Sequence, residues 1–343
     1  MRVRSALTGL LSILLLSSHC LAAPEPPPIS AAESLELLQK LVPDASKLAT
    51  EPQNIQGHPG FRAFGKLGAD EYTATIDAIV PRVTNVTKNG KETYKWPGIF
   101  AVGHRGALKF APENTIASFK KAVELGAHYV EMDVRETKDG QLVIMHDPAV
   151  FRTTRGKGLI SAMTLPEIKQ LDAGALFSPA FAGEKIPTFD EVLDAIHAKA
   201  FPDVDLKAAP PEKIADALRN RGLLEHTTLA KNDPPTLRRV IESGEAKILI
   251  RPQLPKGTEP IAALQHDVNP PLVNIDDMSR FREIHRAAMK VFTNTMIVLP
   301  KSADEEENRI KAAIDNFADY IQTDRLDILV PLLKERGLYA TRQ

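Results

Sequence analysis

The chain has 343 residues, of which 25% are charged and 43% are hydrophobic, and its 43 Lys and Arg nearly balance its 44 Asp and Glu. This composition excludes collagen-like, coiled-coil and wholly disordered proteins, and the length is sufficient for a large hydrophobic core. The net charge of −1 gives no indication of a nucleic-acid partner, because proteins that bind nucleic acids usually carry a basic excess.

Residues 1–23 have the layout of a secretory signal peptide. Two arginines lie within the first four residues, a mainly apolar run extends from Ala6 to Ser18, and the small residues Ala22 and Ala23 follow. The apolar run is too short to cross a bilayer comfortably, and an uncleaved anchor is the alternative. We therefore expect a secreted or periplasmic protein with no membrane span after signal cleavage.

Residues 24–97 are expected to form an N-terminal extension that lies on the main domain, with a separate small domain as the alternative. The apolar spacing predicts a helix over residues 31–42. Residues 83–94 are expected to form a hairpin that turns at Lys88-Asn89-Gly90. No role is predicted for this region.

From residue 98 onward, short apolar runs alternate with helical stretches. The expected strands are 99–102, 129–134, 204–206, 228–230, 247–250, 272–275, 291–295 and 320–322. A further strand at 141–145 follows an Asp139-Gly140 turn that is too short for a parallel crossover, so it must be the return arm of a hairpin. The expected helices are 114–125, 212–221, 236–243, 279–289, 303–317 and 326–336.

This alternation predicts an α/β protein with a (β/α)8 TIM barrel over residues 98–343. An open doubly wound sheet is the alternative, and the lack of a glycine-rich dinucleotide motif before the first helix weakens it. In such barrels the reactive groups lie at the carboxyl ends of the strands. The polar side chains expected at those ends are His104, Arg105, Glu131, Asp133, His146, Asp205 and Lys207.

Three of these side chains are carboxylates that we expect to converge. Residues two apart on a strand point to the same face, so Glu131 and Asp133 project together, as do Asp205 and Lys207. Three converging carboxylates would repel one another unless a cation lay between them. A donor set of oxygens alone suits one divalent cation, Ca²⁺ or Mg²⁺, rather than zinc.

Five motifs in this order resemble those of the glycerophosphodiester phosphodiesterase family: His104-Arg105-Gly106, Pro112-Glu113-Asn114-Thr115, Glu131-Met132-Asp133-Val134, Thr137-Lys138-Asp139-Gly140 and His146-Asp147. The match continues at Arg152-Thr153-Thr154, Ile186-Pro187-Thr188 and Tyr320-Ile321-Gln322-Thr323-Asp324. The resemblance covers about residues 99–338 and excludes residues 24–97. Within the second motif, Asn114 or Thr115 is expected to cap the following helix.

The resemblance implies a metal-dependent barrel that cleaves small-molecule glycerophosphodiesters to glycerol 3-phosphate and an alcohol. It also implies that His104 and His146 are the catalytic pair, that Glu131 and Asp133 bind the metal, and that Arg105 contacts the phosphate. The family's third ligand is usually the Glu of a Glu-x-Lys motif, and the matching residues here are Asp205 and Lys207. Because aspartate is shorter, the ion would lie nearer this strand or bind Asp205 through water.

Two other functions stay open at this point. A lipid-active relative, of the lysophospholipase D or sphingomyelinase D kind, would also suit the Asp-x-Lys motif, whereas His-Arg-Gly and Pro-Glu-Asn-Thr favour soluble substrates. A non-catalytic exported binding protein is disfavoured, because both histidines and all three carboxylates are present. The sequence makes no prediction of the oligomeric state.

Overall fold

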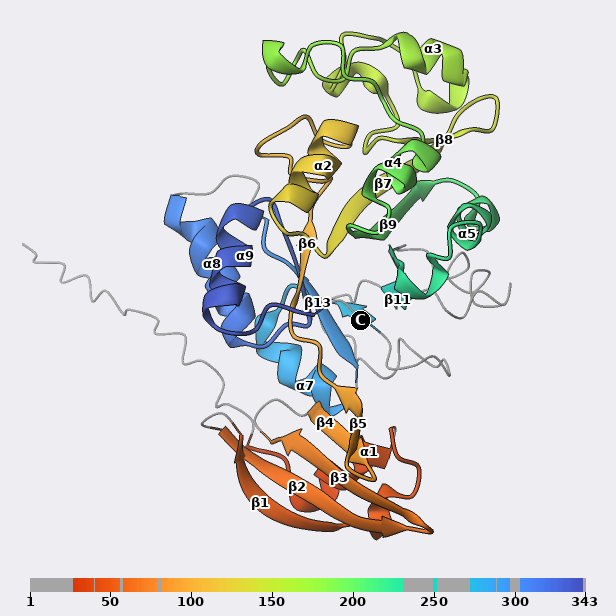
Figure 1. The fold of residues 1–343 in the computed structure, drawn as a ribbon. Helices are drawn as coiled ribbons and strands as arrows, with labels where there is room; N and C mark the ends of the chain where they lie inside the picture. The colour runs from red at the N-terminus through yellow and green to blue at the C-terminus, as the bar shows by residue number, and fades with distance from the viewer. Residues whose placement is uncertain are drawn as a thin grey trace, which may run out of the picture.

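The computed structural model describes residues 27–39, 41–55, 58–78, 82–230, 249–251, 272–287, 289–296 and 303–341. The expected signal peptide and the expected helix over residues 236–243 lie outside these ranges. Figure 1 shows two parts: a small antiparallel sheet near the N-terminus, and a larger α/β part that contains the candidate site residues.

The N-terminal part is a five-stranded antiparallel meander with one helix against it. Its strands are β1 (Ala49–Ile55), β2 (His58–Leu67), β3 (Asp70–Asp77), β4 (Arg82–Lys88) and β5 (Lys91–Lys95), and its helices are α1 (Ala31–Gln39) and the 3₁₀ turn η1 (Ala45–Lys47). Leu38 of α1 and Ile76 of β3 are fully buried in a core that this part builds for itself. The predicted hairpin is confirmed, with positive φ at Asn89 (51°) and Gly90 (74°), as a two-residue turn requires.

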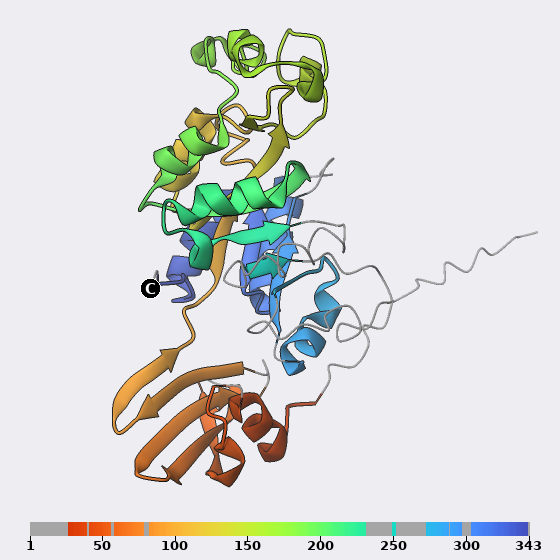
Figure 2. The ribbon, with the colours of Figure 1, turned by 90° about the vertical axis from the view of Figure 1, so that its right-hand side faces the viewer.

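In the described residues, the larger part is built on eight parallel strands. In the order in which they lie side by side, they are β11 (Leu249–Arg251), β10 (Thr228–Ala230), β9 (Phe201–Ala208), β7 (Tyr129–Glu136), β6 (Phe100–Gly103), β14 (Tyr320–Thr323), β13 (Lys290–Asn294) and β12 (Leu272–Asn274). The end strands β11 and β12 contact each other, so the described sheet curls into a barrel (Figures 1 and 2). The strand β8 (Leu142–Ile144) pairs antiparallel with β7, which confirms the second predicted hairpin.

Around this curled sheet lie the helices α2 (Ile116–Glu124), α4 (Phe189–Ile196), α5 (Pro211–Arg219), α7 (Phe281–Arg286), α8 (Ala303–Asp315) and α9 (Leu326–Glu335), with the 3₁₀ turns η5 (Leu224–His226) and η6 (Met278–Arg280). The short helix α3 (Leu165–Gln170) lies apart from the sheet (Figure 1). Neither α3 nor α4 was predicted from the sequence, although α4 begins with a capping box between Thr188 and Glu191. Within the described ranges, no helix has both the length and the apolar character that crossing a membrane requires.

The segment between β8 and α4, residues 147–187, forms a compact addition that we call the rim insertion. It contains η2 (Val150–Arg152), η3 (Ile160–Ala162), α3 and η4 (Pro179–Phe181). Its own small core includes the buried side chains of Val150, Ile160, Ile168 and Ile186. The rim insertion and the β1–β5 sheet lie at opposite ends of the molecule (Figures 1 and 2).

Arg82 of β4 connects the N-terminal sheet to the barrel. Its guanidinium lies 4.3 Å from the Trp96 ring centre, donates to the Phe317 carbonyl at 3.0 Å, and lies 3.6 Å from a carboxylate oxygen of Asp319. Burial alone would raise the pKa of Asp319, but His285 at 2.9 Å and Arg82 together hold this pKa well below its usual range. The contact is therefore a buried ion pair between the two parts.

We expect Arg82→Ala to lower the free energy of unfolding by about 3 kcal/mol, because it leaves the Asp319 carboxylate buried without its guanidinium partner. Urea unfolding of the full chain measures this. Arg62→Ala is a matched control on the same sheet, because Arg62 pairs with Glu51 at 3.1 Å and both side chains are about half exposed; it should cost less than about 1 kcal/mol. Equal losses in the two variants would show that the buried ion pair contributes no more to the free energy of unfolding than the exposed pair does.

Candidate active site

Three carboxylates meet at the carboxyl ends of two neighbouring strands. Glu131 and Asp133 lie on β7, and Asp205 lies on β9 directly opposite Asp133 in the parallel register. One carboxylate oxygen from each residue lies within 4.8 Å of the other two. The structure therefore brings together the three acidic residues that the sequence predicts to converge.

These carboxylates carry an excess of negative charge. Glu131 and Asp133 are 3% and 1% exposed. Burial, followed by the charges of Asp133 and Asp205, raises the pKa of Glu131 well above its usual range. Lys207 lies 2.6 Å from Asp205 and 3.2 Å from Asp133. Burial opposes its charge, but these two carboxylates outweigh burial and raise the pKa of its ammonium group. A divalent cation bound by the three acids would balance the remaining charge.

The loop between β6 and α2 folds over the carboxylates. Arg105 has a positive φ of 49°, and its backbone N–H donates to Glu131 Oε2 at 2.7 Å. Gly106 has a φ of +87°, and a Cβ there would lie 2.5 Å from Ser118 Oγ of α2, so only glycine fits. The His-Arg-Gly motif thus places Arg105 beside the acids by backbone geometry.

Asn114 orients one of the acids. Its φ is +57°, and its side-chain amide donates to Asp133 Oδ2 at 2.7 Å in a buried position. The cap of α2 is Thr115, whose side chain accepts from the Ser118 N–H at 3.3 Å. Asn114 and Thr115 were predicted from the sequence as alternative caps, and the contact between Asn114 and Asp133 was not predicted.

His104 lies at the end of β6 and is held by a carboxylate from the last strand. Its Nδ1 lies 2.7 Å from Asp324 Oδ1, and both side chains are largely buried, at 16% and 12% exposure. The register pairs Thr323 of β14 with Gly103 of β6, which brings the next residues, Asp324 and His104, side by side. No role was predicted for Asp324 from the sequence.

His146 has its own carboxylate partner in the next residue. Its Nδ1 lies 2.7 Å from Asp147 Oδ1, and its carbonyl oxygen accepts from Arg135 Nη2 at 2.5 Å. Burial raises the pKa of Asp147, but hydrogen bonds from Arg152 and His146 outweigh burial and lower this pKa to about 2. Each of the two predicted histidines therefore has its Nδ1 against an aspartate.

A chain of alternating charges runs from one side of the site to the other. Arg105 Nη1 donates to Glu113 at 2.9 Å, and both Nη atoms of Arg152 donate to Glu113 at 2.7 Å. Arg152 also pairs with Asp147, the partner of His146. Burial acts to raise the pKa of Glu113, but Arg152 and Arg105 lower it below its usual value. Glu113 thus links Arg105 to the loop that follows His146.

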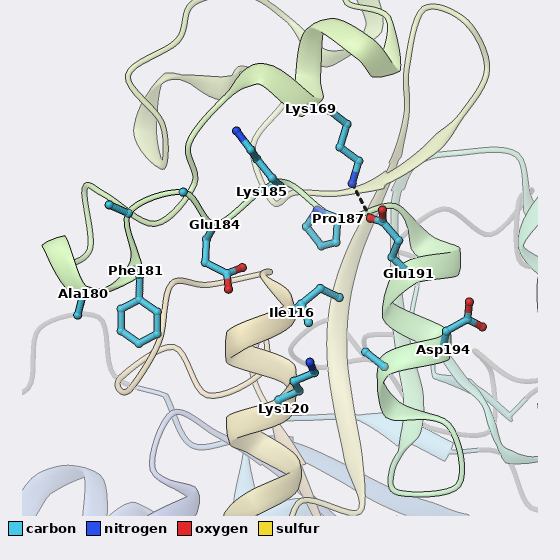
Figure 3. Close-up of a pocket in the computed structure, with 13 residues that line it drawn as sticks. Ile116, Lys120, Lys169, Ala180, Phe181, Glu184, Lys185, Pro187, Glu191 and Asp194 are labelled. Atoms are coloured by element: carbon cyan, nitrogen blue, oxygen red, sulfur yellow. Dashed lines mark hydrogen bonds and ion pairs between the residues drawn. The ribbon is translucent and has the colours of Figure 1, made fainter.

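A separate cleft of about 920 Å³ lies on the outside of the barrel (Figure 3). Its walls come from α2, α4 and residues 180–187, and Lys169 forms an ion pair with Glu191 at its edge. None of the predicted site residues lines this cleft. The candidate active site is therefore defined by its side chains and not by this cleft.

Comparisons with known proteins agree with this geometry. Residues 104–250 match the family model described as "Glycerophosphoryl diester phosphodiesterase family". The chain is 44% identical over 146 residues to a glycerophosphodiester phosphodiesterase of Caldanaerobacter subterraneus, covering 40% of this chain and 60% of that protein. It is 37% identical over 145 residues to one of Bacillus subtilis, covering 40% of this chain and 50% of the relative. The chain thus spans only about half to three fifths of these curated relatives.

Solved structures extend the similarity over the barrel. A glycerophosphodiester phosphodiesterase from Agrobacterium tumefaciens superposes with a TM-score of 0.59 at 29% identity, covering 68% of this chain and 99% of that chain. An Oleispira antarctica phosphodiesterase, solved with the product sn-glycerol-3-phosphate, gives a TM-score of 0.59 at 25% identity, covering 69% of this chain and 97% of that chain.

Fold and site together define a class: α/β barrels with an acidic candidate metal site and two aspartate-held histidines at the carboxyl ends of the strands. The matched part of this chain, residues 104–250, is of the glycerophosphoryl diester phosphodiesterase family. The family prediction and the barrel prediction made from the sequence are both confirmed.

Proposed function

We propose that this chain is a phosphoric diester hydrolase that converts small soluble glycerophosphodiesters to glycerol 3-phosphate and an alcohol. The observation that carries the proposal is the group of three carboxylates whose oxygens lie within 4.8 Å of one another, beside the loop that contains His104 and Arg105. The named activity of the similar proteins from Caldanaerobacter and Bacillus supports it.

Glu131, Asp133 and Asp205 would hold one divalent cation, Ca²⁺ or Mg²⁺. The donor set consists of carboxylate oxygens, which suit these hard ions. The raised pKa of Glu131 marks a local excess of negative charge that a cation would relieve. When bound, the cation supplies Lewis-acid neutralisation of the phosphodiester charge.

Arg105 and Lys207 would bind the phosphate. Arg105 Nε is buried, makes no hydrogen bond to the described residues, and lies 3.5 Å from Asp133 Oδ2, so the guanidinium is held beside the acids where the phosphate would bind. A guanidinium can contact two phosphate oxygens at once, and the Lys207 ammonium adds a point charge. Together they would hold the phosphate in position. Their positive charges would also reduce the repulsion between the anionic phosphodiester and the attacking oxygen.

His104 and His146 would transfer the protons. Since Nδ1 of each ring faces an aspartate, Nε2 is the atom left to exchange a proton with substrate. In the first step the 2-hydroxyl of the glycerol moiety attacks phosphorus, one imidazole takes the hydroxyl proton, and the other protonates the leaving alcohol oxygen. Water then opens the cyclic phosphate, with the two imidazoles in exchanged roles, so both return to their starting protonation states.

The proposed reaction is tested by incubating the chain, with Ca²⁺ or Mg²⁺ present, with glycerophosphocholine, lysophosphatidylcholine or sphingomyelin. We expect glycerol 3-phosphate and choline from glycerophosphocholine alone. Choline release from the two lipids, but not from glycerophosphocholine, would favour the lipid-active alternative. No turnover of any substrate with either ion would favour a non-catalytic binding protein.

We expect Asp324→Asn to lower kcat by about 10–100-fold, the usual effect of losing a group that orients a functional imidazole. An amide cannot stabilise the imidazolium form of His104 as a carboxylate does, so the pH profile of kcat should shift while KM changes little. Asp327→Asn is the matched control, because Asp327 pairs with Arg325 at 2.7 Å on the same segment. A normal kcat and pH profile in Asp324→Asn would contradict the positioning role.

We also propose that the protein acts outside the cytoplasm, in the periplasm or after secretion. The charged, apolar and small-residue layout of residues 1–23 supports this location. Cell fractionation with N-terminal sequencing of the product tests it, and the expected result is an exported chain that begins near residue 24. A chain that retains residues 1–23 in the cytoplasm would exclude it.

A further inference from the structure

Large exposed apolar side chains are concentrated on the rim insertion. Among the described residues, the exposed large hydrophobic side chains are Leu41, Phe110, Phe151, Leu159, Leu176 and Phe177. Four of these six belong to residues 147–187. Phe151 and Leu159 are 66% and 51% exposed. Exposed apolar side chains that gather in one place usually mark a surface that binds a partner or a membrane.

Phe151 and Leu159 lie on two paired segments, in which Ala149 is directly opposite Leu159. The Val150 N–H donates to the Gly158 carbonyl at 3.1 Å, and the Ile160 N–H donates to the Pro148 carbonyl at 2.9 Å. The neighbouring side chains of Val150 and Ile160 are fully buried in the core of the insertion. Because Val150 and Ile160 are packed in this core, the backbone at Phe151 and Leu159 is held in place while their side chains stay exposed to solvent.

The segment between these two side chains is basic. Residues 148–166 contain Arg152, Arg155 and Lys157 and no Asp or Glu. Arg152 pairs with Asp147 and Glu113. Arg155 and Lys157 are exposed, and neither forms an ion pair with a described residue. Their charges are therefore available to an external anionic partner.

We propose that residues 148–159, which we call the docking loop, bind the surface of membranes that contain anionic lipids. Phe151 and Leu159 enter the interface, and Arg155 and Lys157 contact the lipid head groups. Apolar side chains flanked by cations are the combination that holds a protein at such an interface. A nucleic acid would need the cations but would not need Leu159. The exposed apolar pair therefore favours the lipid surface.

Docking there would place the candidate active site at the membrane. The docking loop begins two residues after His146, and its Arg152 contacts Asp147 and Glu113 beside the site. The N-terminal sheet lies at the other end of the molecule (Figure 2) and would point away from the lipid. This proposal does not depend on the proposed hydrolysis, because binding is measured without any substrate.

The test is co-sedimentation of the chain from residue 24, the form expected after signal cleavage, with two kinds of vesicle at low salt. One contains equal parts of phosphatidylcholine and phosphatidylglycerol, and the other contains phosphatidylcholine alone. We expect binding to the mixed vesicles and much weaker binding to phosphatidylcholine. Phe151→Ser with Leu159→Ser should weaken binding about tenfold or more. Arg155→Gln with Lys157→Gln should weaken it by roughly fivefold for each charge removed.

Leu41→Ser is the matched control, because Leu41 is also exposed, at 42%, but lies on the N-terminal part. It should bind vesicles as the unmodified chain does, and all variants should keep the same thermal unfolding midpoint. Failure of the unmodified chain to sediment with the mixed vesicles would overturn the proposal. So would a loss of binding in the charge variant but not in the apolar variant, because it would show that Phe151 and Leu159 do not enter the lipid interface.

Discussion

Replacing His104 or His146 with alanine is expected to lower kcat for glycerophosphocholine hydrolysis by roughly 10²–10⁴-fold. Each imidazole has Nδ1 fixed against an aspartate, Asp324 at 2.7 Å and Asp147 at 2.7 Å. Alanine removes the proton carrier and leaves the aspartate in place. Steady-state release of glycerol 3-phosphate measures the loss, and KM should change much less than kcat because neither ring is proposed to bind the phosphate.

His197 provides the control for these two substitutions. It follows α4, is exposed, and has no place in the proposed chemistry. His197→Ala should therefore turn over substrate at the normal rate. If His104→Ala or His146→Ala also retained a normal kcat, the proposed role of that histidine would be wrong, whatever its distance from an aspartate.

Replacing Glu131 with glutamine is expected to have opposite effects on activity and on the stability of the metal-free protein. Activity should fall at low cation concentration, because the amide is a weaker ligand than the carboxylate, and excess Ca²⁺ or Mg²⁺ should restore part of it. Without a cation, the variant should unfold at a higher temperature than the unmodified chain. Its neutral amide avoids the cost of ionising a buried group beside Asp133 and Asp205.

The pH dependence of this difference follows from the raised pKa of Glu131. Above its ordinary value of 4.5 the unfolded chain has lost this proton while the folded chain still holds it. The stability of the metal-free protein therefore falls as pH rises through the folded-state pKa. The glutamine variant lacks this contribution, so its advantage should grow with pH and should disappear when saturating cation is added. Thermal unfolding at several pH values, with and without the ion, measures this. A less stable metal-free variant would contradict the charge argument.

The barrel and most of the candidate site could be predicted from the sequence for a simple geometric reason. Parallel strands of a barrel end at one rim, so polar residues at successive strand ends must converge there. The convergence of Glu131, Asp133 and Asp205 could be predicted from this rule and the two-residue period of a strand alone. The positions of the neighbouring loops were harder to predict, because backbone conformations such as the positive φ of Asn114 decide which acid its side chain contacts.

Other features of the structure depend on contacts between residues far apart in the chain, which no local sequence pattern predicts. Asp324 meets His104 because β14 lies beside β6 when the sheet curls round, across 220 positions of sequence. The first three strands of the N-terminal sheet were not predicted, and the second of them, β2, falls in a segment, residues 57–68, that mixes glycine and aromatic residues without a clear period. The start of α4, by contrast, could have been predicted from the spacing of Thr188 and Glu191.

In the proposed mechanism, acids from β7 and β9 bind one divalent cation at the same rim as the two histidines. Crystals grown with Mn²⁺, which shares the oxygen-ligand preference of Mg²⁺, test it through the anomalous scattering of the ion. We expect a single strong peak within roughly 2.0–2.6 Å of carboxylate oxygens of Glu131 and Asp133, with Asp205 bound directly or through one water. A peak elsewhere on the protein, or none at these acids at saturating Mn²⁺, would contradict it.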